Sequence, residues 1–332
     1  MGVDISKEKV DIAIIDSNYD VIHEKTVKNN PETLLSFMKS VLRKLKIEKQ
    51  EILVCCEETG IYKRPLQQVC SKWGLALWVE IALKIKRAST SLRGKSDKQD
   101  AVRIAEYALR YLDRMNLYIE PSQAQNRLQS LLNVRESLLN EATRMNQRMK
   151  ESKRFDKDVF NIQNAYCKEV LEILKNQITK IERDIDVLLS QQPAMKQTVE
   201  LLSTIPGVGR QTALQFIVYT RNFSLFQTAK QLACYAGIAP FLNESGGQIK
   251  KARVSQFANK KLKKLLHLAA MASIRVESDL KSYFIRKVQE GKNKLLVLNN
   301  IRNKLVKRMF AVIKRQSEYI SNNFETNICT LT

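Results

Sequence analysis

Histidine and paired cysteines, the usual ligands of zinc, are scarce in this sequence. It holds two histidines, and none of its six cysteines is part of a CxxC pair, which argues against a zinc finger or a zinc hydrolase site. No apolar run approaches the ~18 residues of a membrane helix, and the N-terminal segment lacks the pattern of a secretory signal. We therefore expect reduced cysteines, a cytoplasmic location and no membrane partner.

Acidic residues are scarce in the last third of the chain. Residues 201–332 contain 22 Lys and Arg but only 6 Asp and Glu, a net +16 out of +22 for the whole chain. So uneven an excess indicates a polyanionic partner, with nucleic acid as the first candidate. Hydrophobic residues make up 44% of the 332 residues, enough for a folded core and for two or three domains.

The N-terminal part alternates between strand and helix patterns. Strands are expected at Val3–Ile5, Asp11–Asp16, Val21–Val27, Ile52–Cys56 and Leu75–Ile81, and helices from Pro31, over Gly60–Trp73 and from Ser96 or Asp97 to about Leu112. A basic loop, residues 84–95, precedes the last helix. The order β-β-β-α-β-α-β-α is that of a ribonuclease-H-like fold, so residues 1–118 are expected to form an α/β domain with a mixed, helix-flanked sheet.

Glycine is absent from residues 121–192, where apolar residues follow heptad spacing. The stripes run over residues 128–149, interrupted by Arg135, and over 171–188. This pattern predicts two long helices, broken near Lys153–Asp158 and ended by Pro193, that fold back on each other or pair with another subunit. We expect residues 119–195 to form a coiled-coil region that makes the protein a homo-oligomer, either a dimer or a tetramer.

Residues 196–316 are expected to form a mainly helical domain, followed by a polar tail at 317–332. The domain opens with a helix-hairpin-helix-like segment, in which IPGVG precedes Arg210. Its glycines free backbone N–H groups for a phosphate, although an ordinary turn between helices is the alternative. A loop is expected at Phe241–Val254. The residues predicted to contact nucleic acid are Arg210, Lys250, Lys251, Arg253, Lys260, Lys261, Lys263, Lys264, Arg302, Lys307 and Arg308.

Four carboxylates converge if the N-terminal sheet has the ribonuclease-H-like order. Asp4 lies on the first strand, and Glu57 or Glu58 ends the fourth, which such a sheet places beside the first. Asp97 and Asp100 share one face of the helix packed above. So many carboxylates need cations, and two Mg²⁺ ions are the usual answer. The alternative is that each acid is a helix cap or a solvated surface group.

Six sequence blocks cover nearly the whole chain: GVDISKEKVDIAI, CEETGIY, KSDKQDAVRIA, TIPGVGRQTA, LACYAGIAP and NESGG. In content and in order they resemble the blocks of the DEDD transposases of bacterial insertion sequences, the one-ten and eleven-eleven groups, and of the related Piv-type DNA invertases. The resemblance implies a RuvC-like catalytic domain and selects Glu57 over Glu58. Its four metal-binding, catalytic acids are Asp4, Glu57, Asp97 and Asp100.

The resemblance also implies that Ser245 attacks the DNA phosphate and holds the cut end as a phosphoserine. Gly246 and Gly247 would let a phosphate approach the backbone, but no histidine lies nearby in sequence to take the serine proton. From the residues alone, an ordinary loop serine is the alternative.

The function implied by the resemblance is that of a transposase or site-specific recombinase. It would cut and rejoin donor and target DNA in the bacterial cytoplasm, at the nucleoid, guided by a structured RNA from the element. The alternative is a RuvC-like Holliday-junction nuclease, which shares the carboxylates but forms no covalent intermediate. A non-catalytic nucleic-acid scaffold would not need all four acids.

Overall fold

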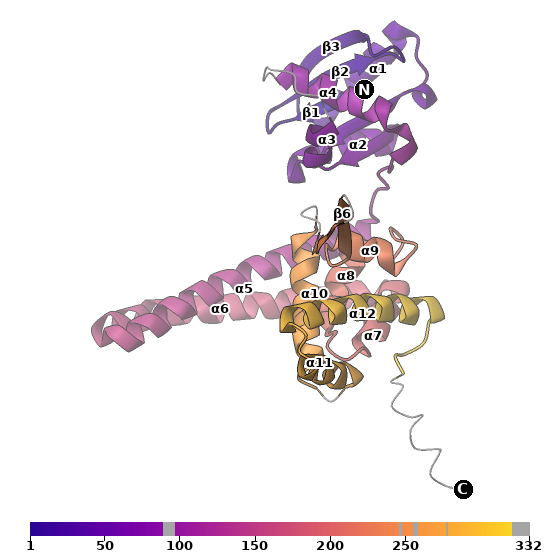
Figure 1. The fold of residues 1–332 in the computed structure, drawn as a ribbon. Helices are drawn as coiled ribbons and strands as arrows, with labels where there is room; N and C mark the ends of the chain where they lie inside the picture. Colours follow the sequence, from indigo (N-terminus) through magenta and orange to yellow (C-terminus); the bar gives the residue numbers. More distant parts are fainter. Residues whose placement is uncertain (89–96, 246–247, 255–257, 277, 321–332) are drawn as a thin grey trace. The chain divides into compact units, whose positions relative to one another are not determined.

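The computed structural model describes residues 1–88, 97–245, 248–254, 258–276 and 278–320, with side chains for all of these except 97, 98, 240–245 and 248–254. Contacts divide the chain into two compact units, Met1–Glu120 and Pro121–Thr332. The structure confirms a mixed α/β sheet in the first unit and a mostly helical second unit (Figure 1). No helix within these ranges is long and apolar enough to cross a membrane.

The first unit is built on a five-stranded sheet with the order β3-β2-β1-β4-β5. Its strands are β1 (Gly2–Ile5), β2 (Lys9–Ile15), β3 (Val21–Lys28), β4 (Leu53–Glu57) and β5 (Ala76–Glu80), each within two residues of the expected bounds. β1, β2 and β3 are antiparallel neighbours, whereas β4 runs parallel to both β1 and β5. Parallel partners need crossover connections, which the helices supply.

Helices cover both faces of this sheet. On one face, α1 (Pro31–Leu45) and α2 (Arg64–Trp73) bury Leu34 and Leu66 against the strands. On the other, α4 (Asp97–Arg110) packs Ile104 and Tyr107 against Trp78 of β5. Alternate strand residues point to opposite faces, so each strand divides its side chains between the two cores.

A short helix, α3 (Ala82–Ala88), corrects one prediction. It occupies the start of the expected basic loop at residues 84–95. Ile85 accounts for the difference, because its side chain is buried in the same cluster as Trp78 and so anchors the segment to the sheet. Residues 89–96 lie outside the described residues.

The close packing of α4 on β1 depends on Gly2. A Cβ atom at this position would lie 2.1 Å from the carbonyl oxygen of Ala101 and 2.4 Å from the backbone nitrogen of Ala105. Because these are backbone atoms, they cannot turn aside. Glycine therefore sets how near the helix carrying Asp100 comes to the strand carrying Asp4.

In the second unit, α5 (Gln123–Phe155) and α6 (Lys157–Ser190) lie side by side as a long helical pair (Figure 1). The chain reverses at Asp156, within the predicted break, and its side chain caps α6 by accepting from the N–H groups of Asp158 and Val159. Arg135, the polar interruption of the first stripe, forms an ion pair with Glu182 of α6.

The remaining helices are α7 (Pro193–Ser203), α8 (Arg210–Thr220), α9 (Ala229–Tyr235), α10 (Lys260–Ser273), α11 (Asp279–Gln289) and α12 (Lys294–Arg315). They share one hydrophobic core with the inner ends of α5 and α6; Ile301 and Leu305 of α12, Leu128 of α5 and Ile185 of α6 all belong to it. Of the predicted polar tail, residues 321–332 lie outside the described residues.

A β-hairpin replaces the loop expected at Phe241–Val254. β6 (Pro240–Ser245) pairs antiparallel with β7 (Gln248–Val254), and Ser245 is the residue opposite Gln248. The sequence prediction was wrong because it treated the two glycines after Ser245 as a phosphate-binding element only. Two short runs separated by Gly-Gly are also a hairpin signal.

Replacing Gly2 with alanine should destabilise the first unit. The added Cβ would force α4 away from β1, an overpacking that typically costs about 1–3 kcal/mol. Hydrogen exchange followed by mass spectrometry should show faster exchange in β1 and α4, with the amides of α8 and α12 as internal reference. Unchanged protection of α4 would contradict this account of the packing.

Candidate active site and nucleic-acid interface

A row of four carboxylates crosses the sheet of the first unit. Asp11 of β2 pairs in register with Asp4 of β1, and Glu57 of β4 pairs with Glu80 of β5. Val3 is paired with Cys56 in the parallel register, so the residues that follow, Asp4 and Glu57, are neighbours as well. In-register residues point to the same face of a sheet, here the face covered by α4. Adjacent like charges destabilise a sheet, so this row needs compensating positive charge or hydrogen bonds.

The two inner acids of the row open into a cavity. Asp4 and Glu57 line it together with Asp100, which the first turn of α4 contributes. The cavity has a volume of about 390 Å³, and its remaining walls come from α3 and Arg103. Arg103 forms an ion pair with Asp100 at 2.7 Å. Three of the four predicted catalytic acids therefore meet at one site.

Glu57 and its neighbour Glu58 differ sharply in environment. Burial, followed by the charges of Asp4 and Asp100, raises the pKa of Glu57. Glu58 is half exposed and forms an ion pair with Lys63. Only Glu57 lies among the cavity-lining residues, because successive strand residues face opposite sides of the sheet.

The two outer acids, Asp11 and Glu80, are buried, and the sequence analysis missed both. Asp11 accepts a hydrogen bond from the Thr26 hydroxyl and lies 3.3 Å from the Lys9 ammonium. Glu80 forms an ion pair with Lys84 at 3.0 Å and accepts a hydrogen bond from the Tyr107 hydroxyl at 3.3 Å. A signal existed for Glu80: it ends the apolar run ALWVE as Glu57 ends LVCCE.

Several predicted site residues lie where no side chain is described. Asp97 begins α4, one turn before Asp100, but its side chain is outside the described set. The same holds for Ser245 at the end of β6 and for Lys250, Lys251 and Arg253 on β7. The first unit contributes Asp97, and the second contributes the other four.

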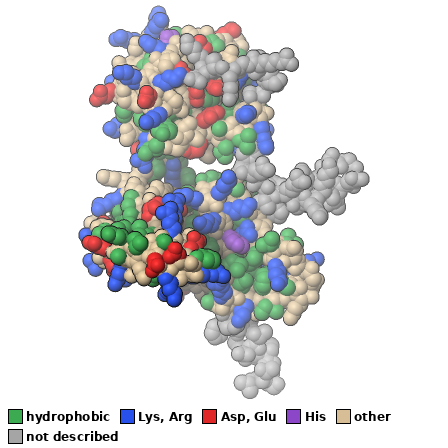
Figure 2. Space-filling model, turned by 90° about the vertical axis from the view of Figure 1, so that its left-hand side faces the viewer, with side chains coloured by type: hydrophobic (Ala, Val, Ile, Leu, Met, Phe, Trp, Pro, Cys, Tyr) green, Lys and Arg blue, Asp and Glu red, His purple; other side chains and the backbone are tan. Residues whose placement is uncertain are grey.

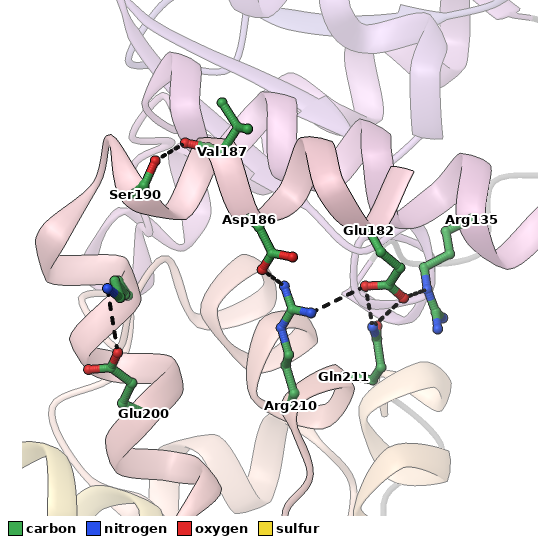
Figure 3. Close-up of polar contacts among 9 residues, drawn as sticks. Arg135, Glu182, Asp186, Val187, Ser190, Glu200, Arg210 and Gln211 are labelled. Carbon is green, nitrogen blue, oxygen red and sulfur yellow. Dashed lines mark hydrogen bonds and ion pairs between the residues drawn. The ribbon is translucent and has the colours of Figure 1, made fainter. Parts of the chain in front are cut away.

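Arg210 is engaged within the protein. It begins α8, directly after the glycine turn, and its guanidinium forms ion pairs with Asp186 and Glu182 of α6 (Figure 3). Glu182 also accepts hydrogen bonds from Gln211 and Arg135, so one carboxylate joins α5, α6 and α8 (Figure 3). In this structure Arg210 therefore fastens the long helical pair to the helix hairpin.

The other predicted contact residues fall into two groups. Arg308 is bound by Asp279, Arg302 is half-buried beside His267, and Lys261 pairs with Glu136 at 3.0 Å. Lysines that face solvent are Lys260 and Lys264 on α10 and Lys307 on α12, with Lys263 half-buried. Lys and Arg side chains are spread over the visible face of the second unit, with acidic side chains among them (Figure 2).

Two family models match the chain. One, described as a transposase of the DEDD type of IS110, matches residues 1–152, which contain all four predicted acids. The other, described as the transposase IS116/IS110/IS902 family, matches residues 199–284, which contain Ser245. The fold, the acid row and these matches define the class: the chain is a transposase, an enzyme of DNA recombination.

Three proteins of similar sequence show which transposases the chain resembles. The pilin gene-inverting protein of Moraxella lacunata is 26% identical over 332 residues, covering 96% of this chain and 97% of that protein. The transposase for insertion sequence element IS1111A of Coxiella burnetii is 23% identical, covering 96% and 90%. An uncharacterized 43.6 kDa protein of insertion element IS110 from Streptomyces coelicolor is 28% identical over 151 residues, 46% of this chain and 36% of that protein. The chain belongs to the IS110 family of transposases.

Replacing the solvent-facing Lys260, Lys264 and Lys307 with glutamine should weaken DNA binding whatever the DNA sequence. Each lost phosphate contact should flatten the slope of log K against log salt by about 0.9 on duplex DNA, or about 0.7 on a single strand. Fluorescence anisotropy over a salt series measures the slope. Replacing the exposed Lys25, Lys28 and Lys44 of the first unit removes the same charge and is the matched control; equal slopes for both triple variants would contradict the assignment.

Proposed function

We propose that this enzyme cuts and rejoins DNA strands with a magnesium-bound carboxylate cluster in a ribonuclease-H-like, RuvC-type first unit and a serine nucleophile in the second. The meeting of Asp4, Glu57 and Asp100 around one cavity is the observation that carries the proposal. The sheet order, with a parallel β1–β4 pair at its centre and α4 above, supports the ribonuclease-H-like assignment.

The donor set fits magnesium. Carboxylate oxygens are the ligands that Mg²⁺ prefers. Burial, and after it the charges of Asp4 and Asp100, raise the pKa of Glu57, and a cation would relieve the repulsion among these three acids. Among the described side chains, no three acids lie close enough together to hold a metal ion. Asp97, whose side chain is not described, would be the fourth carboxylate of the proposed site. Asp4, Glu57, Asp97 and Asp100 would hold two ions. Bound there, magnesium would supply charge stabilisation and a lowered pKa at an attacking oxygen.

Ser245 would carry the strand between cutting and rejoining. Its hydroxyl oxygen would bond to the DNA phosphorus as a phosphodiester P–O bond breaks, the serine proton leaving to a base and the departing sugar oxygen taking a proton. The covalent link conserves the phosphodiester, so rejoining needs no outside energy source. Ser245 ends β6 opposite Gln248, on a hairpin whose second strand also carries Lys250, Lys251 and Arg253, and this position is compatible with a phosphate close to the backbone.

The partners in this proposal are donor and target DNA, a structured guide RNA and a second copy of the chain. The guide RNA rests on the family resemblance alone. A second copy is supported by α6, which carries apolar residues that are more than 40% exposed and recur at coiled-coil spacing. They are Val159, Ile162, Tyr166, Val170 and Ile173. We place the assembly at the bacterial nucleoid.

Removing the carboxylate of Glu57 should separate metal binding from folding. Glu57→Gln should lower strand cleavage by about 100-fold or more, because several kcal/mol of metal-dependent stabilisation is lost. It should also abolish the rise in melting temperature on adding Mg²⁺, while slightly raising the metal-free value by removing a repelled charge. Glu58→Gln, one residue away on the opposite face, should keep both properties. A normal Mg²⁺ response in Glu57→Gln would refute the metal site.

Replacing Ser245 distinguishes the recombinase from a junction nuclease. Wild-type protein with cognate DNA and Mg²⁺ should form a protein–DNA adduct that survives denaturation, visible as a mass-shifted band. Ser245→Ala should lose both the adduct and strand transfer. Its free energy of unfolding should stay within about 1 kcal/mol of the wild-type value, as expected for the loss of a hydroxyl at a hairpin end. Cleavage at the wild-type rate, with no adduct in either protein, would favour the metal-only Holliday-junction nuclease instead.

A further inference from the structure

Glu80 is a buried carboxylate that the proposed chemistry leaves without a role. It ends β5, is 7% exposed, and accepts hydrogen bonds from the backbone N–H of Ile81 at 2.8 Å, from Lys84 and from Tyr107. Glutamate is rarely buried unless its charge is paired, because desolvation of the charge is costly. A buried carboxylate in register with Glu57 therefore calls for a function.

The donors to Glu80 come from the two helices that frame the catalytic cavity. Lys84 belongs to α3, which supplies the cavity wall through Leu83 and Ile85. Tyr107 belongs to α4, two turns after Asp100, and its ring packs on Trp78 at 5.3 Å between centroids. Burial and then the Glu80 charge raise the pKa of Tyr107, which keeps its hydroxyl protonated as the donor.

Glu80 points to these helices and not into the cavity. Within the described part of the chain, the cavity lining includes Glu57 but not Glu80, although both share a sheet face and register. The charges that perturb Glu57 are those of Asp4 and Asp100. The contacts of Glu80 with Lys84 and Tyr107 are those of a residue that would orient α3 and α4 without itself binding a metal ion.

We propose that Glu80 is a positioning residue of the metal site: by binding Lys84 and Tyr107 at once, it holds α3 and α4 so that Asp100 faces Asp4 and Glu57. The inference rests on the proposed metal-dependent function and deepens it. Residues that orient metal ligands typically contribute about 10–100-fold to metal affinity.

The experiment compares Glu80→Ala with Glu80→Gln in the full chain, titrating Mg²⁺ against both melting temperature and strand cleavage. Glu80→Ala should raise the Mg²⁺ midpoint in both readouts by about tenfold and lower kcat, with the Kd for DNA unchanged. Glu80→Gln keeps an oxygen acceptor for Ile81 and Tyr107, so its midpoint should stay within about threefold of wild type.

Val69→Ala is the control for a purely structural effect. Val69 is buried on α2 against the opposite face of the same sheet, so its truncation should lower the melting temperature without shifting the Mg²⁺ midpoint. Tyr107→Phe removes one donor to Glu80 and should shift the midpoint in the same direction as Glu80→Ala, by less.

Three outcomes would overturn the proposal, and they differ from one another. A Glu80→Ala protein that loses only melting temperature, as Val69→Ala does, would make Glu80 structural. A Glu80→Gln protein as defective as Glu57→Gln would make Glu80 a direct ligand. A wild-type protein without any Mg²⁺ response would refute the metal site itself and this role with it.

Discussion

The parallel pairing of β1 with β4 is the constraint on which the first unit depends. It sets Asp4 beside Glu57 at the carboxyl ends of two central strands, with Asp11 and Glu80 completing the row. Four neighbouring carboxylates repel one another, and the protein compensates this repulsion differently for the outer and the inner pair. The outer acids are neutralised by hydrogen bonds and lysines, while the inner pair faces a cavity. The uncompensated negative charge is thereby confined to the cavity.

The helix above the row completes the site through close backbone contact. Gly2 lets α4 approach β1, and the Tyr107–Glu80 hydrogen bond and the Tyr107–Trp78 contact fix it at its other end. Asp100, in the first turn of this helix, reaches the cavity as a consequence. The packing of α4 on the sheet thus determines the position of Asp100, a helix residue, relative to the strand residues Asp4 and Glu57.

In the second unit, contacts between distant segments likewise fix the position of a helical element, here the long pair of α5 and α6. Glu182 of α6 binds Arg135 of α5 together with Arg210 and Gln211 of α8. The inner ends of the long helices also enter the core built around α12. A charge cluster and a hydrophobic core together fix the long pair to the helical body, from which α5 and α6 project (Figure 1). The exposed apolar residues of α6, between Val159 and Ile173, lie on the half of this helix that is farther in sequence from that core.

Much of the fold follows from local sequence patterns. The five strands, the long helical pair and its reversal at Asp156 could be predicted because period-2 and period-3.6 apolar patterns and capping residues act locally. The hairpin at β6–β7 and the short α3 were missed. In α3, three of the seven residues are Lys or Arg, and only Ile85, buried against the sheet, reveals why this helix forms.

The sequence by itself determined the residue types and the order of strands and helices along the chain, because the apolar periodicity of each element is a local property. The prediction that Asp4, Glu57 and Asp100 meet rested on this order. Tertiary structure alone decided which polar groups are paired. Arg210, which the sequence suggested as a phosphate ligand, forms ion pairs with Asp186 and Glu182. Glu80 is buried and accepts hydrogen bonds from Lys84 and Tyr107. Pairing between groups far apart in the chain depends on packing distances, which no local pattern encodes.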